Sequence, residues 1–100
     1  MSRATFIASA INHYAYARNG LVSMAVIAAS EASRAGITTD QLMGRSSARL
    51  IAHARQDAMR RIREALGYSY PRIGRFFGRD HTTVVHGVRA SAARAGEFSE

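Results

Sequence analysis

A single glycine between two short helical segments is the sequence feature that most restricts how this chain can fold. Ser69 suits a helix N-cap and is followed by the chain's only proline, which the first turn tolerates, so we expect a helix from 69 to 77. Gly78 ends that helix, and a second helix is expected from about 80 to 94. Two helices joined by so short a turn form a helix-turn-helix unit.

The start of the second helix gathers side chains that can read DNA bases. They are Asp80, His81, Thr82 and Thr83. Aspartate accepts a hydrogen bond from cytosine N4, histidine can bond a purine or a phosphate, and threonine methyls suit the methyl group of thymine. Alternatively, Asp80 only caps the helix and the threonines fill its first turn. Capping alone does not explain why His81 and two threonines follow Asp80. We therefore expect these side chains to contact base edges in the major groove. Asp80 can cap the helix and contact a base as well.

The segment from 69 to 87 strongly resembles the DNA-binding C-terminal domain of the bacterial chromosomal replication initiator DnaA. The run at 78–86, Gly-Arg-Asp-His-Thr-Thr-Val-Val-His, carries the resemblance. Residues 36–45 resemble the family's loop and short helix, and residues 54–59 resemble the start of its long connecting helix. The resemblance covers 21–90 and implies an all-α fold with a DnaA-like or TrpR-like helix-turn-helix.

The resemblance also implies roles for single residues. Arg55 aligns with an arginine that enters the minor groove, a narrow electronegative slot that suits a planar guanidinium. Phosphate contacts, which fix register without reading sequence, are expected from Arg45, Arg49, Arg63, Ser69, Arg72, Arg75 and Arg79. Arg63 and Ser69 match family positions that touch phosphate. For each of these residues the alternative is an ordinary solvated side chain.

The chain departs from the family pattern at four positions. Only Gly78 precedes Arg79, where the family commonly has two glycines, so the turn is expected to aim the second helix differently. Asp57 and Arg61 stand where the family is usually apolar, which indicates changed neighbours or a polar surface. Arg72 stands where the family is often acidic, which adds affinity for phosphate. The departures leave the target DNA sequence open.

The rest of the chain also has helical spacing. Apolar residues recur at 5–18, at 21–35 and at 48–66 with the period of a helix, and 40–43 suits one short turn. No segment alternates like a strand, so the fold class is all-α. We divide the chain into an N-terminal amphipathic helix at 1–20, a DnaA-C-terminal-like DNA-binding domain at 21–95 and a flexible tail at 96–100.

Charge points to a polyanionic partner. The net charge is +7, and residues 45–94 hold eleven arginines and three acidic residues, which gives 11 − 3 = +8. A basic surface of this kind suits phosphates, although a merely solvated face would look similar. The chain has no lysine, so a Walker A phosphate loop, and with it the ATPase module of DnaA, is expected to be absent.

Catalytic, metal-binding and membrane functions lack support in the sequence. His81 and His86 are five residues apart, whereas a helical zinc pair needs four, and no cysteine is present. No nucleophile motif accompanies Asp80 and His81, so we expect no enzyme, no metal and no cofactor. The longest apolar run, 24–29, is too short to span a bilayer, and we expect a cytoplasmic protein of the bacterial nucleoid.

We therefore interpret the chain as a stand-alone double-stranded DNA-binding protein. The resemblance implies a transcription regulator of phage-derived or gene transfer agent genes, and the alternative is a modulator of replication initiation at DnaA-box-like sites. A third hypothesis is an interaction adaptor whose 1–20 helix recruits RNA polymerase, a nucleoid protein, a co-regulator or a second copy. The same helix could instead pack on the domain, and the oligomeric state stays open.

Overall fold

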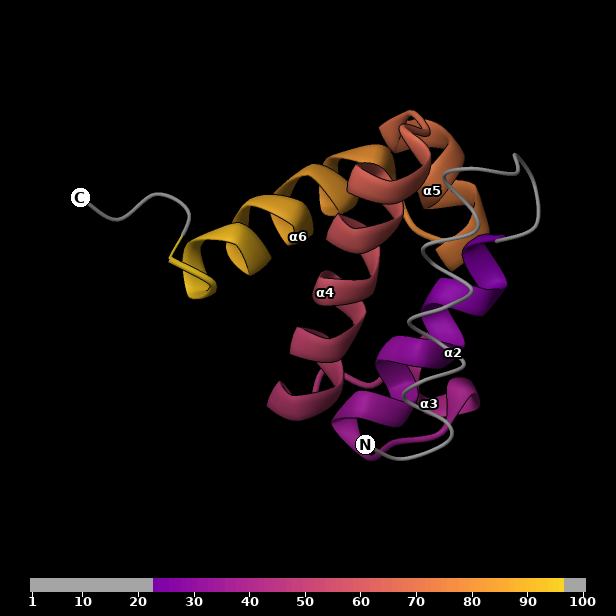
Figure 1. Ribbon diagram of the computed structural model, residues 1–100, viewed down its shortest axis with the longest axis vertical. Helices are drawn as coiled ribbons and strands as arrows, with labels where there is room; N and C mark the ends of the chain where they lie inside the picture. Colours follow the sequence, from indigo (N-terminus) through magenta and orange to yellow (C-terminus); the bar gives the residue numbers. More distant parts are fainter. Residues whose placement is uncertain (1–22, 97–100) are drawn as a thin grey trace.

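The fold is a set of α-helices, seen here in a computed structural model that describes residues 23–96 (Figure 1). The helices are α2 (Met24–Ala35), α3 (Thr39–Met43), α4 (Arg49–Leu66), α5 (Tyr70–Phe77) and α6 (His81–Arg94). No strand occurs between residues 23 and 96, so the predicted all-α class is confirmed, and each predicted helix in that range is present. The helix expected at 1–20 and most of the tail expected at 96–100 lie outside the described residues.

Polar caps and glycines set the ends of these helices. Thr38 and Gln41 form a capping box at the start of α3, because each side chain satisfies a backbone N–H at the position of the other. Ser69 accepts a hydrogen bond from the Arg72 backbone N–H at 3.2 Å and so caps α5, as predicted. The predicted glycine ends of α2 and α4 are also present, at Gly36 and Gly67. These signals are local, which explains why the sequence located the helices well.

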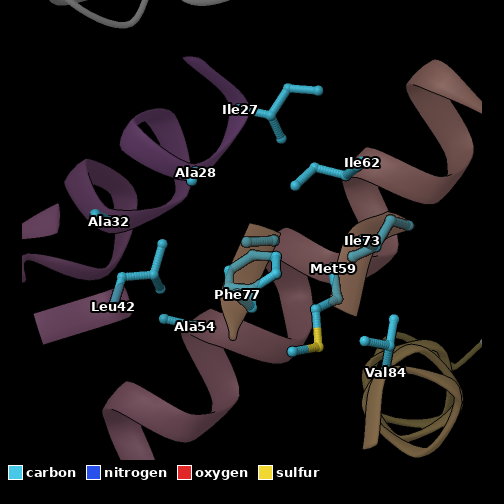
Figure 2. Packing of buried hydrophobic residues seen from close by; sticks show 11 residues of the cluster. Ile27, Ala28, Ala32, Leu42, Ala54, Met59, Ile62, Ile73, Phe77 and Val84 are labelled. Atoms are coloured by element: carbon cyan, nitrogen blue, oxygen red, sulfur yellow. The ribbon is translucent and has the colours of Figure 1, made fainter. Parts of the chain in front are cut away.

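The core forms where α4 passes between the other helices. Figure 2 shows Met59 and Ile62 of α4 lying among Ile27 of α2, Ile73 of α5 and Val84 of α6. All five side chains are at most 1% exposed. Because one helix supplies a face to all the others, the orientation of the helix-turn-helix depends on packing against α4.

The turn between α5 and α6 is built around Gly78. This residue has a left-handed backbone with φ 67°, a conformation that glycine adopts without strain. Phe77, the last residue of α5, is buried in the core directly before this glycine. One glycine is therefore enough to end α5 and begin the turn.

The two unusual polar positions of α4 have polar neighbours. Asp57 accepts hydrogen bonds from the Ser91 hydroxyl at 2.6 Å and from Arg94 at 3.0 Å, both on α6. Arg61 forms an ion pair at 2.9 Å with Glu31 of α2, a carboxylate whose residue is only 5% exposed. These charges join α4 to the helices on either side of it, and the choice between changed neighbours and a polar surface stays a prediction.

Candidate nucleic-acid interface

The four predicted base-reading residues lie together at the exposed start of α6. The side chains of Asp80 and His81 are 68% and 59% exposed, and Thr82 and Thr83 are also exposed. On the opposite face of the helix, Val84 is buried in the core. The packing of α6 therefore presents its first turn to solvent, where a duplex could reach it.

Asp80 caps α6 while staying accessible. One carboxylate oxygen, Oδ2, accepts a hydrogen bond from the Thr82 backbone N–H at 3.1 Å. The other, Oδ1, lies 3.6 Å from Nδ1 of His81. Asp80 therefore does cap α6, but the cap uses only one of the two carboxylate oxygens. Hydrogen bonds from the side chain and backbone of Thr82 lower the pKa of the Asp80 carboxyl, and the charge of His81 adds a smaller contribution in the same direction.

This shift predicts how the start of α6 responds to acid. Because the pKa of Asp80 is lower in the folded chain than in the unfolded chain, the ionised cap contributes stability above the unfolded value of about 3.9. That contribution is lost as the pH falls through the folded value. An NMR titration of the Asp80 carboxyl should therefore give a midpoint below the ordinary one, with the Thr82 amide signal following it. In Asp80→Asn the Thr82 amide signal should no longer change with the titration of residue 80. A normal or raised titration midpoint of the Asp80 carboxyl in the native chain would contradict the hydrogen-bonded cap.

The arginines fall into two groups, of which the first is paired with carboxylates. Four of them belong here: Arg34 and Arg61 with Glu31, Arg60 with Glu64, and Arg94 with Asp57. These pairs lie where α4 meets α2 and the C-terminal part of α6. Acidic residues therefore neutralise arginines at the contacts of α4 with α2 and with the C-terminal part of α6.

The second group has no carboxylate partner among residues 23–96 and includes every predicted phosphate-binding arginine. Arg45, in the loop before α4, and Arg49, the first residue of α4, are both exposed. On α5, Arg72 and Arg75 are exposed, and the Arg72 guanidinium lies 3.6 Å from the centre of the Tyr68 ring. Unneutralised cations on the helix-turn-helix and on the α3–α4 loop give this side of the domain its positive charge.

Two predicted phosphate-binding residues also hold the backbone. Arg63 donates to the Tyr68 carbonyl oxygen at 2.7 Å, and its guanidinium lies 4.4 Å from the centre of the Tyr70 ring. Arg79 donates to the carbonyl oxygens of Phe77 at 2.9 Å and Gly44 at 2.7 Å. Arg79 therefore ties the helix-turn-helix turn to the loop after α3. Burial lowers the pKa of Arg79, and the nearby charge of Arg45 lowers it further, so these two cations lie close together.

The minor-groove role of Arg55 stays a prediction, and the structure places the side chain against the loop before α4. Its residue is only 6% exposed, and its Nε donates to the Leu42 carbonyl oxygen at 2.7 Å. Its two terminal nitrogens donate to the carbonyl oxygens of Ser46 at 3.0 Å and Gln41 at 3.4 Å. These bonds use three of the five N–H donors of the guanidinium and leave one on each terminal nitrogen. Arg55 fixes α3 and the α3–α4 loop to the side of α4.

The prediction of contact residues missed Arg89. It is exposed on α6, and no carboxylate of the described residues pairs with it. The sequence spacing could have predicted its position, because residue 89 follows Thr82 by seven positions and therefore lies on the same helix face. The outer face of α6 thus carries a cation well beyond its first turn.

Between residues 23 and 96, no group of three His, Cys, Asp or Glu side chains is placed to hold a metal ion. None of the helices in that same range combines the length and the apolar character needed to cross a bilayer.

Comparison with known proteins places the same residues in a family. The profile of the family described as the bacterial DnaA protein helix-turn-helix matches residues 24–90. The chain is 36% identical over 93 residues to the chromosomal replication initiator protein DnaA of Deinococcus radiodurans. That match covers 93% of this chain and 20% of the relative, so the chain spans about a fifth of the length of this curated relative.

Proposed function

The chain belongs to the family of bacterial DnaA helix-turn-helix domains, and we propose that it binds double-stranded DNA in a sequence-specific manner. The observation that carries the proposal is the exposed first turn of α6, where Asp80, His81, Thr82 and Thr83 stand together. In a helix-turn-helix the N-terminal residues of the second helix contact base edges in the major groove. The four side chains are of the types that discriminate bases there.

Phosphate contacts would come from the cations around that turn. Arg72 and Arg75 lie on the first helix of the unit, which crosses the DNA backbone in this docking geometry, and both are exposed. Arg45 and Arg49 extend the positive surface through the α3–α4 loop, and the Ser69 hydroxyl at the start of α5 can still donate its proton. These contacts would set the register in which the base-reading residues meet their targets.

Substitutions at the first turn of α6 should separate base reading from general attraction. We expect His81→Ala or Thr83→Ala to weaken binding to the preferred duplex by about 1–3 kcal/mol and to relax base preference. Arg75→Ala should weaken all duplexes to a similar extent, because a phosphate contact carries no sequence information. An unbiased selection of bound duplexes would define the preferred site, and titrations on that site and on a scrambled one would give the two losses. Equal losses on both duplexes from all three variants would contradict base reading by α6.

For the biological role we propose transcription regulation, of phage-derived or gene transfer agent genes. The single glycine of the α5–α6 turn and the exposed Arg72 on α5 support a target other than the usual DnaA box. The similarity to a replication initiator favours a second candidate, which is modulation of initiation at DnaA-box-like sites. Mapping genome-wide occupancy separates the two roles, since enrichment confined to the replication origin would exclude the transcriptional one, and enrichment at promoters elsewhere would support it.

A further inference from the structure

The exposed face of α6 continues beyond its first turn as one stripe. Thr82, His86 and Arg89 follow one another at spacings of four and three residues, and all three are exposed. Gly87 and Ser91 are buried on the opposite face of the helix. We propose that duplex contact extends along this stripe, with His86 at the base edges and Arg89 on a phosphate. The inference depends on the proposed duplex binding and adds two contact residues to it.

Arg89 differs from the other arginine on α6 in having its guanidinium available. No carboxylate of residues 23–96 pairs with Arg89. Arg94, five residues later, donates to Asp57 at 3.0 Å, to Gln56 at 2.7 Å and to the His53 carbonyl oxygen at 3.2 Å. One helix therefore carries two arginines of opposite character. Arg94 joins α6 to α4, whereas Arg89 faces outward and can neutralise a charge supplied by a partner.

The dimensions of a helix and of the major groove place that charge at a phosphate. At a rise of about 1.5 Å per residue, Arg89 lies about 12 Å along the helix axis from His81. The major groove is about 8.5 Å deep, so a residue about 12 Å back along an inclined helix lies beyond the level of the groove floor. When the first turn of α6 lies against base edges, Arg89 therefore comes near the edge of the groove, where the phosphates run.

His86 lies between these two positions on the same stripe. Its imidazole can donate and accept hydrogen bonds, as base edges require. It follows Thr82 by about one turn, or roughly 6 Å along the axis, and so would meet a neighbouring base pair. An acidic protein surface is the other partner that an unpaired arginine could attract. DNA is favoured because Arg89 lies on one stripe with Thr82, which is one of the proposed base-reading residues.

The decisive measurement is the salt dependence of binding by Arg89→Ala. On the duplex that the selection identifies, the logarithm of the binding constant falls with the logarithm of the salt concentration, with a slope set by the number of phosphates contacted. We expect Arg89→Ala to reduce that slope by about one and to weaken all duplexes alike. In a phosphate-ethylation interference experiment, the same variant should show one phosphate position fewer at which ethylation prevents binding. Its thermal unfolding should match that of the native chain, because Arg89 has no partner to lose among the described residues.

Two controls and one further variant complete the test. Arg34→Ala and Arg94→Ala remove one charge each from arginines that are paired with carboxylates, and both should keep the native slope. His86→Ala should keep the slope and lose preference at one base pair beside those lost with Thr83→Ala. An unchanged slope and interference pattern in Arg89→Ala would overturn the inference, and so would an equal slope change in Arg34→Ala. A native chain that binds no duplex would overturn the proposed function as well, whereas normal native binding with an unaffected Arg89→Ala overturns the inference alone.

Discussion

Replacing Arg55 with alanine is expected to lower the free energy of unfolding of this domain by about 3 kcal/mol. The side chain makes two short hydrogen bonds from a charged, buried donor, to the carbonyl oxygens of Leu42 and Ser46, and each is worth about 1.5 kcal/mol or more. Their loss would also free the α3–α4 loop, which carries Arg45. Urea unfolding of the native and variant chains, followed by circular dichroism, measures the difference.

Arg55→Lys is the matched variant for this prediction. It keeps the positive charge but replaces a fork of donors with a single ammonium, which cannot serve three carbonyl oxygens in the same directions. We therefore expect Arg55→Lys to be destabilised as well. If both variants unfold like the native chain and lose only DNA affinity, the side chain acts on DNA and not on the fold. That result would support the hypothesis that Arg55 enters the minor groove.

Gly74→Ala should have a comparable effect, also about 3 kcal/mol, the upper end for overpacking a close-packed site. A Cβ at this position would lie 2.5 Å from the carbonyl oxygen of Arg79, the last residue but one before α6. The same backbone approach is held by a hydrogen bond of 2.8 Å from the Arg79 N–H to the Gly74 carbonyl oxygen. Since both atoms in the clash belong to backbone or are fixed to it, α5 and α6 must move apart.

A DNA-binding measurement distinguishes an effect of Gly74→Ala on the position of α6 from a purely local packing defect. A shift of α6 relative to α5 changes how the first turn meets base edges, so affinity for the preferred duplex should fall more than affinity for a scrambled one. Gly87→Ala is the control, because its added Cβ would meet the Met59 sulfur at 2.9 Å, and that flexible side chain can give way. Thermal unfolding and duplex titration of both variants test this. Equal stability of the two variants would show that the α5–α6 contact tolerates a methyl group.

The helices and the first turn of α6 could be predicted because local signals govern them. Ser69, Gly78 and Asp80 cap or end helices through hydrogen bonds to residues one to three positions away, and amphipathic spacing located α4. The exposure of the base-reading residues followed in the same way, since Val84 and Gly87 had to face the core. Family resemblance and helix periodicity therefore agreed on where this chain would present side chains to DNA.

Tertiary structure alone decided what the arginines do. The twelve arginines between residues 23 and 96 divide into carboxylate-paired, backbone-bound and available ones through partners distant in the chain. Arg55 binds carbonyl oxygens nine to fourteen residues earlier, and Arg94 reaches back to residues near 57. Arg89 has no carboxylate partner among residues 23–96. The sequence by itself determined which helix exposes the proposed base-reading residues, whereas packing of α4 against its neighbours determined which cations of the described residues stay unpaired, because burial and pairing depend on atoms that meet only after folding.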